Sequence, residues 1–211
     1  ELYNNKIQDM KFLEKADLTE IKLLDFFSNN ITDIDVLEKV NILTKVNFND
    51  LVKLDLFNTK LSDISFLAET KFEKLEELDL GRNKISDINI LEKVNFKLLK
   101  KLNLEENKIS DINVLRKVKF EQLEELNLSS NQIFDINILE KVDCRKIKTL
   151  FFGDNKISDI KIIEKVNFER IEDLDFSINP IPEDELYSIM TKLSSRIKGF
   201  DYFTLKIEYI I

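Results

Sequence analysis

The sequence contains no histidine, no tryptophan and only one cysteine among its 211 residues. The absence of histidine removes the most versatile general acid and base and the commonest metal ligand, which argues against catalysis and metal binding. A single cysteine excludes an internal disulfide. No run of eighteen apolar residues occurs, and the first ten residues lack the basic and apolar regions of a signal peptide. We therefore expect no membrane insertion.

Acidic residues outnumber basic ones, 40 to 32, which gives a formal charge of -8. This balance argues against a nucleic-acid partner, because phosphate contacts need a basic surface. Hydrophobic residues make up 43% of the chain and charged residues 34%. That composition is sufficient to bury a core and lies outside the range of disordered chains.

The dominant feature is an internal repeat, in which most units are 24 residues long and follow the pattern apolar-x-x-Leu-x-apolar-x-x-Asn-x-Ile. Seven units begin near residues 21, 51, 75, 99, 123, 147 and 171. The first interval is longer because residues 38–43 add six residues, and residues 1–20 match the second half of a unit. We expect repeats over residues 1–181 and a C-terminal cap over residues 182–211.

Each unit predicts a short strand followed by a helical turn. The stretch LxLxx alternates apolar and polar residues, as in a strand with one buried face, and segments such as 87–96 place apolar residues for one helical turn. Asn89 and Glu92 fit a capping box at the start of that turn. Neither element encloses a core alone, so the units must stack and share one. After residue 181, Pro182 and three acidic residues predict the start of a helix that ends near Lys198, followed by an edge strand or the start of a further element.

Units such as LEELDLGRNKISDINILEKVNF (75–96) resemble leucine-rich repeats, closest to those of bacterial internalins and of the protein phosphatase 1 regulatory subunit. The resemblance covers about residues 2–181. It implies an α/β fold: a right-handed solenoid with a parallel concave β-sheet, short helical convex segments and a C-terminal helical cap. It also implies protein binding. The localisation stays open, because internalins suggest a secreted or cell-surface adhesin and the phosphatase regulator suggests a cytoplasmic scaffold.

Several residue columns have structural explanations. An asparagine recurs once per unit and resembles the asparagine ladder of this repeat type, with Thr59 as its interruption. An aspartate also recurs once per unit, which predicts turn capping rather than the clustered ligands of a calcium site. Cys144 stands where other units have Phe, so we expect a buried filler. Phe134 stands where other units have Ser; a lateral contact with a partner is possible, and local packing is the simpler interpretation.

The predicted binding surface is the concave face. Numbering a unit from its first apolar residue, positions four and six point inward, so positions three, five and seven point to the concave side. The variable strand positions carry thirteen acidic and six basic residues, so the acidity is concentrated on this face. The predicted protein-binding residues are Asp25, Phe27, Asp55, Phe57, Glu77, Asp79, Asn103, Glu105, Asn127, Phe151, Asp173 and Asp175.

Two features of this face stand out. Asp25, Asp55 and Asp79 form a carboxylate column in which adjacent pairs repel by about 0.9 kcal/mol, so we infer that folding gains nothing from it and a cationic partner would. Beside it, Phe27 and Phe57 are expected to touch and to form an aromatic patch for a partner. The alternative is that the six-residue insertion or a preceding repeat covers these two rings. Phe151 is expected on the same face, because Phe152 fills the core position. It should lie about 19 Å from Phe57, with Gly153 leaving space beside its ring.

These observations predict a non-catalytic protein–protein interaction module with no cofactor and no metal, whose partner is a protein with a basic or mixed surface. Nothing in the chain supplies a nucleophile with a base, a phosphate loop or a set of metal ligands. The alternatives are the recognition arm of a larger enzyme, or of a surface adhesin, whose other domain is absent from this chain. A structural spacer is a further alternative, and the Phe and Asp columns count against it.

Overall fold

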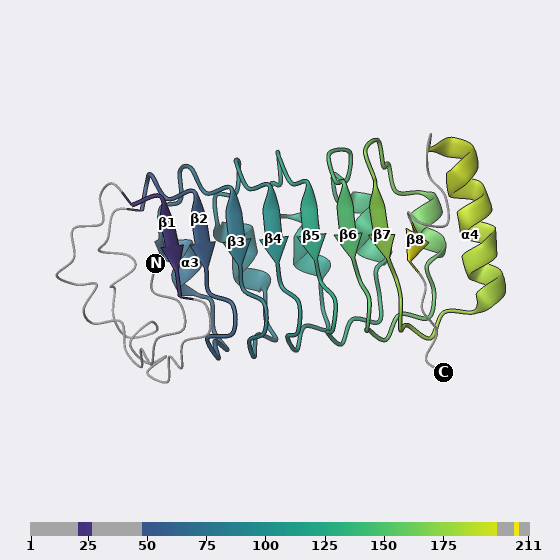
Figure 1. Ribbon diagram of the computed structural model, residues 1–211, viewed down its shortest axis with the longest axis horizontal. Coiled ribbons are helices and arrows are strands. Elements are labelled where there is room, and N and C mark those ends of the chain that lie inside the picture. Colours follow the sequence, from purple (N-terminus) through teal and green to yellow (C-terminus); the bar gives the residue numbers. More distant parts are fainter. Residues whose placement is uncertain (1–20, 27–47, 198–204, 207–211) are drawn as a thin grey trace.

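The structure, a computed structural model, describes residues 21–26 and 48–197, together with the backbone of residues 205–206. Eight parallel strands form one sheet whose order follows the sequence (Figure 1). The strands are β1 Leu23–Asp25, β2 Lys53–Asp55, β3 Glu77–Asp79, β4 Lys101–Asn103, β5 Glu125–Asn127, β6 Thr149–Phe151, β7 Asp173–Asp175 and β8 Leu205–Lys206. The sheet and the helical segments form two layers of a solenoid, so the fold prediction is confirmed.

The strands pair at equivalent positions of successive units. Leu78 pairs with Leu102, which pairs in turn with Leu126, at the 24-residue spacing of the repeat. β1 and β2 keep the same register across the longer interval, with Leu24 opposite Leu54. Side chains at one position of the unit therefore form columns across the sheet. Residues 38–43, Asn29 and the partial unit at 1–20 lie outside the described residues.

Short helical segments cover one face of the sheet, behind the strands in Figure 1. They are α3 Phe66–Glu69, η2 Asn89–Lys93, η3 Asn113–Arg116, η4 Asn137–Lys141 and η5 Lys161–Glu164, and the four η segments are 3-10 helices. The predicted capping box is wrong: no side chain caps η2 from its N-cap, and the Asn89 amide instead donates to Asp87 Oδ1 at 2.8 Å. The aspartate column thus caps these turns, as predicted.

The core lies between the two layers. The inward residues at positions four and six are buried, and Phe rings of neighbouring units stack, as Phe152 and Phe176 do at 5.6 Å between centroids. Cys144 is 1% exposed, which confirms it as a buried filler, and burial raises the pKa of its thiol to about 12. Each unit therefore buries its apolar side chains largely against its neighbours.

The asparagine ladder is also confirmed for the described units. The amide of Asn131 donates to the carbonyls of Leu104, Leu128 and Ser129 at 3.0 to 3.1 Å, and its Oδ1 accepts the amide of Ile109 at 3.0 Å. Each ladder residue thus bonds its own turn and the preceding unit. The same arrangement recurs at Asn83, Asn107, Asn155 and Asn179.

Thr59 holds the ladder position in the β2 unit. It is fully buried, and its hydroxyl donates to the Leu56 carbonyl at 2.8 Å. Asn83 of the next unit accepts the amides of both Thr59 and Leu61. A hydroxyl has one proton where the amide has two, so this turn makes fewer bonds than the others.

A helix covers the C-terminal end of the solenoid. α4 Glu183–Arg196 begins after Pro182, carries three acidic residues in its first turn and buries Leu186, Ile189, Met190 and Leu193. Arg196 donates to the Val166 carbonyl at 2.8 Å, and Lys192 pairs with Glu164 at 2.7 Å. The predicted cap helix is confirmed; Lys198 lies outside the described residues. β8 pairs in parallel with β7 at the edge of the sheet.

None of the helices in the described ranges has the length and apolar character needed to span a bilayer.

Candidate functional site

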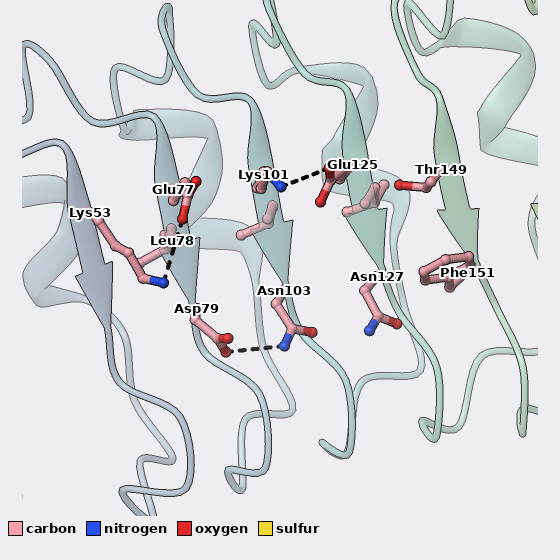
Figure 2. Close-up of a pocket in the computed structure, with 12 residues that line it drawn as sticks. Lys53, Glu77, Leu78, Asp79, Lys101, Asn103, Glu125, Asn127, Thr149 and Phe151 are labelled. Atoms are coloured by element: carbon pink, nitrogen blue, oxygen red, sulfur yellow. Dashed lines mark hydrogen bonds and ion pairs between the residues drawn. The ribbon is translucent and has the colours of Figure 1, made fainter. Parts of the chain in front are cut away.

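The candidate site is the face of the sheet opposite the helical segments, which we call the open face. It carries the side chains at positions three, five and seven of each unit. Figure 2 shows its central part, where one row of side chains comes from position three and a second row from position five. The two rows differ in how their charges are paired.

In the upper rows, at positions two and three, lysine and glutamate alternate across neighbouring strands. Lys101 Nζ lies 2.8 Å from Glu125 Oε1, and Lys53 lies 3.5 Å from Glu77 (Figure 2). Further ion pairs join equivalent positions of neighbouring units. At position two, Lys100 pairs with Glu76 and Lys148 with Glu124. At position eight, in the turn, Arg82 pairs with Glu106. The pairs are partly exposed and stabilise the fold little. These pairs use five of the six basic residues counted at the variable strand positions, together with five acidic residues. The net negative charge therefore comes from the acidic residues that remain, chiefly the aspartates at position five.

Position five has a structural role that the sequence did not reveal. In five units the side-chain Oδ1 of the Asp or Asn there accepts the amide two residues further on, such as Gly81 for Asp79 at 2.9 Å and Ser129 for Asn127 at 3.0 Å. The same bond occurs at Asp55, Asn103 and Asp175. The inference that folding gains nothing from the aspartates is therefore wrong, because they satisfy the backbone where each strand ends.

The predicted carboxylate column exists. Asp25 lies opposite Asp55, and Asp55 lies opposite Asp79, on adjacent strands. Burial raises the pKa of both Asp55 and Asp79, and the neighbouring acids Asp25 and Asp55 respectively raise them further, against the lowering effect of the backbone bonds. Within the described residues, no lysine or arginine forms an ion pair with Asp55 or Asp79.

Two asparagines continue the column across the middle of the sheet. The Asn103 amide donates to Asp79 Oδ1 at 3.1 Å, and the Asn127 amide donates to Glu105 Oε2 at 2.7 Å. The predicted site residues Asp79, Asn103, Glu105 and Asn127 thus form a hydrogen-bonded series along the open face. They are half-buried, so their remaining acceptor groups face solvent at the surface.

Phe57 is held by residues of the next unit. A Cβ on Gly81 would lie 2.9 Å from the Phe57 ring, so the glycine leaves room for that ring. The Arg82 guanidinium lies over the ring at 5.7 Å from its centroid. Phe57 is therefore half-buried. Phe27, its predicted neighbour, lies outside the described residues.

Phe151 lies on the open face and Phe152 in the core, as the repeat register predicts. Phe152 is fully buried, whereas Phe151 is half-buried in the position-five row beside Asn127 (Figure 2). The expected role of Gly153 is wrong: its nearest neighbours are Asp175 and Ser177, so it makes room for those side chains. Asp175 accepts the Ser177 hydroxyl at 2.6 Å, and Asp173 is half-buried at position three of the same strand.

A shallow groove of about 290 Å³ runs between the two rows. It extends from Lys53 on β2 to Phe151 and Thr149 on β6, with the ion-paired row along one side and Asp79, Asn103 and Asn127 along the other (Figure 2). No set of three or more potential metal-binding side chains occurs in the described parts of the chain. The groove offers polar contacts and one aromatic ring, an arrangement suited to binding a peptide or protein surface.

Phe134 lies away from the open face. It is 64% exposed, so the interpretation of local packing is wrong. The sequence signal for this residue was its departure from the serine that other units carry at the same position. The ion pairs of the open face also had a signal in the sequence, since Lys101 and Glu125 stand one repeat apart and therefore lie on adjacent strands.

Family models match two segments of the chain: one described as leucine-rich repeats (two copies) over residues 49–93, and one as a leucine-rich repeat over residues 122–141. These segments carry the strand, ladder and 3-10 turn described above. The chain is a leucine-rich-repeat protein. A search of curated protein sequences found no match for this leucine-rich-repeat chain.

Solved structures share its architecture. An internalin (inlF) from Listeria monocytogenes is 25% identical, with a TM-score of 0.70 over 99% of this chain. A leucine-rich-repeat protein of Leptospira interrogans is 21% identical over 91%, with a TM-score of 0.66. The ectodomain of the receptor kinase GASSHO1/SCHENGEN3 from Arabidopsis thaliana, solved with CASPARIAN STRIP INTEGRITY FACTOR 2, is 19% identical over 90%, with a TM-score of 0.59. The chain spans 62%, 50% and 21% of these proteins respectively. Leucine-rich-repeat domains are typically protein-interaction modules.

Proposed function

We propose that this leucine-rich-repeat protein is a non-catalytic interaction module whose open face binds a protein with a basic or mixed surface. The observation that carries the proposal is the pair of adjacent, half-buried carboxylates of Asp55 and Asp79, neither of which forms an ion pair with a lysine or arginine of the described residues. By contrast, five glutamates at positions two, three and eight each form an ion pair with a lysine or arginine. A lysine or arginine of a partner would supply the missing counter-charge at Asp55 and Asp79.

Phe151 provides a second contact of different character. It stands at the far end of the groove from β2, where its half-buried ring can pack against an apolar side chain of the partner. Aromatic anchors with nearby charge are common centres of binding energy in protein interfaces. The proposal thus places a cation near β2 and β3 and an apolar residue near β6.

The chain itself offers substitutions that test this face while preserving its fold. Asp79→Asn and Phe151→Asn each introduce the residue that already stands at position five in the β4 and β5 units. Asp79→Asn keeps a side-chain acceptor for the Gly81 amide, and Phe151→Asn supplies one for the Gly153 amide. A basic partner isolated on the wild-type protein should bind each variant about tenfold more weakly, the effect of losing one interface contact of about 1.4 kcal/mol.

The measurement is the dissociation constant of each purified variant for that partner, by biolayer interferometry at fixed salt. Glu140→Gln serves as the control, because it also exchanges an acid for an amide but on the exposed side of η4. Unchanged affinity of both open-face variants, with thermal unfolding also unchanged, would place binding elsewhere on the molecule.

A further inference from the structure

A second ladder of extended segments runs along one flank of the solenoid, where the chain leaves each strand for the helical side. The amide at position ten donates to the carbonyl at position eleven of the preceding unit; Lys108 bonds Ile85, and Lys156 bonds Ile133, both at 2.8 Å. Position eleven is buried, while positions ten and twelve are exposed. The two exposed positions therefore form parallel columns. We call them the flank surface, which consists of Lys84, Ser86, Lys108, Ser110, Gln132, Phe134, Lys156 and Ser158.

Phe134 is the most exposed large apolar side chain in the described part of the protein, at 64%. It stands in the position-twelve column between Ser110 and Ser158, whose small side chains leave both sides of the ring open. Because serine serves at this position in the neighbouring units, the repeat does not need an aromatic residue here. An exposed aromatic ring without a packing role is typical of a contact residue.

The position-ten column beside it is basic. Lys84, Lys108 and Lys156 are exposed, and none of them forms an ion pair with another residue of the described ranges. Lysines on the open face, such as Lys101, are by contrast paired with glutamates. Gln132 interrupts the column in the same unit as Phe134, so Lys108 and Lys156 flank the aromatic residue about 10 Å apart, two strand spacings.

We propose that the flank surface binds a second protein partner, through a segment that carries one apolar side chain between two carboxylates. In an extended segment, residues i, i+2 and i+4 lie on one side, so an acid-x-apolar-x-acid pattern presents all three groups together. Phe134 packs against the apolar residue, and Lys108 and Lys156 receive the carboxylates. The aspartates that follow at position thirteen, Asp111, Asp135 and Asp159, accept the amides two residues further on, so Lys108 and Lys156 are the groups that select an acidic segment. This proposal is independent of the proposed function of the open face.

The experiment is selection of a random peptide display library on the full chain, followed by affinity measurement of the enriched peptides. We expect peptides in which acids flank an apolar residue. Phe134→Ser should weaken their binding about tenfold. Since this variant restores the residue of the neighbouring units, its thermal unfolding should match that of the wild type. The double variant Lys108→Gln/Lys156→Gln should also weaken binding and reduce its dependence on salt.

Lys141→Gln/Lys165→Gln is the charge-matched control, because both lysines are exposed on the helical side. It should leave the affinity unchanged. Enrichment of basic peptides only, or of peptides that bind Phe134→Ser as well as the wild type, would overturn the proposal. So would self-association of the wild type that Phe134→Ser abolishes, because the flank surface would then bind a second copy of this chain.

Discussion

Replacing Asp55 by asparagine separates the two roles of the carboxylate column. Asparagine keeps an Oδ1 that can accept the Phe57 amide, now bound by Asp55 at 3.0 Å, and removes only the charge. Asp55 lies between Asp25 and Asp79 in the sheet. At a strand spacing of about 4.8 Å, each repulsion costs about 0.9 kcal/mol at the dielectric of water, so Asp55→Asn should raise the free energy of unfolding by about 1.7 kcal/mol at neutral pH and low salt.

The sign of the pH dependence follows from the raised pKa of Asp55. A group whose pKa is higher in the folded state disfavours folding above that pKa, and this penalty disappears as the pH falls toward its ordinary value of 3.8. The advantage of Asp55→Asn should therefore be largest at neutral pH, shrink in acid below the folded pKa, and shrink in high salt.

Urea unfolding of wild type, Asp55→Asn and Asp55→Ala at neutral and acid pH measures these effects. Asp55→Ala also removes the repulsion but loses the acceptor, so it should be about 1 kcal/mol less stable than Asp55→Asn. The reasoning is refuted if Asp55→Asn is less stable than the wild type at neutral pH, or if its gain is the same in acid.

Three further outcomes follow from the described contacts. Asn131→Ala should lower the free energy of unfolding by about 4 kcal/mol in urea, because four hydrogen bonds of about 1 kcal/mol each are lost; Asn131→Thr, which imitates Thr59, should cost less. Gly81→Ala should cost about 1 to 3 kcal/mol by the same measurement, because the added methyl group overlaps the Phe57 ring. The Cys144 thiol should react with a thiol reagent at mildly alkaline pH only after unfolding, since burial raises its pKa to about 12; rapid reaction of the native protein would contradict its placement.

Most of the fold could be predicted because the same residue pattern recurs in every unit, so each unit supports the assignment made for the others. The asparagine ladder follows from one residue recurring at the same position, and the inward orientation of Phe152 follows from its alignment with leucines at position six. Even the register of Asp25, Asp55 and Asp79 could be read, because parallel strands of one repeat stack at equivalent positions.

Less of the site could be predicted, because it depends on side-chain conformations between units. The sequence alone did not show that Arg82 lies over Phe57, or that the carboxylate of Asp79 accepts a backbone amide. The sequence predicted capping by both Asn89 and the aspartate column, and only the structure shows that Asp87 accepts the Asn89 amide.

The repeat period alone therefore defines which residues face the core and which face outward, since burial alternates along each extended segment and recurs with every unit. Tertiary packing decides what the outward residues do. It pairs Lys101 with Glu125, leaves Asp55 without an ion pair among the described residues, and leaves Phe134 exposed. The physical reason is that outward side chains gain little from any one arrangement, so their contacts are chosen by neighbours in space rather than by the pattern of the chain.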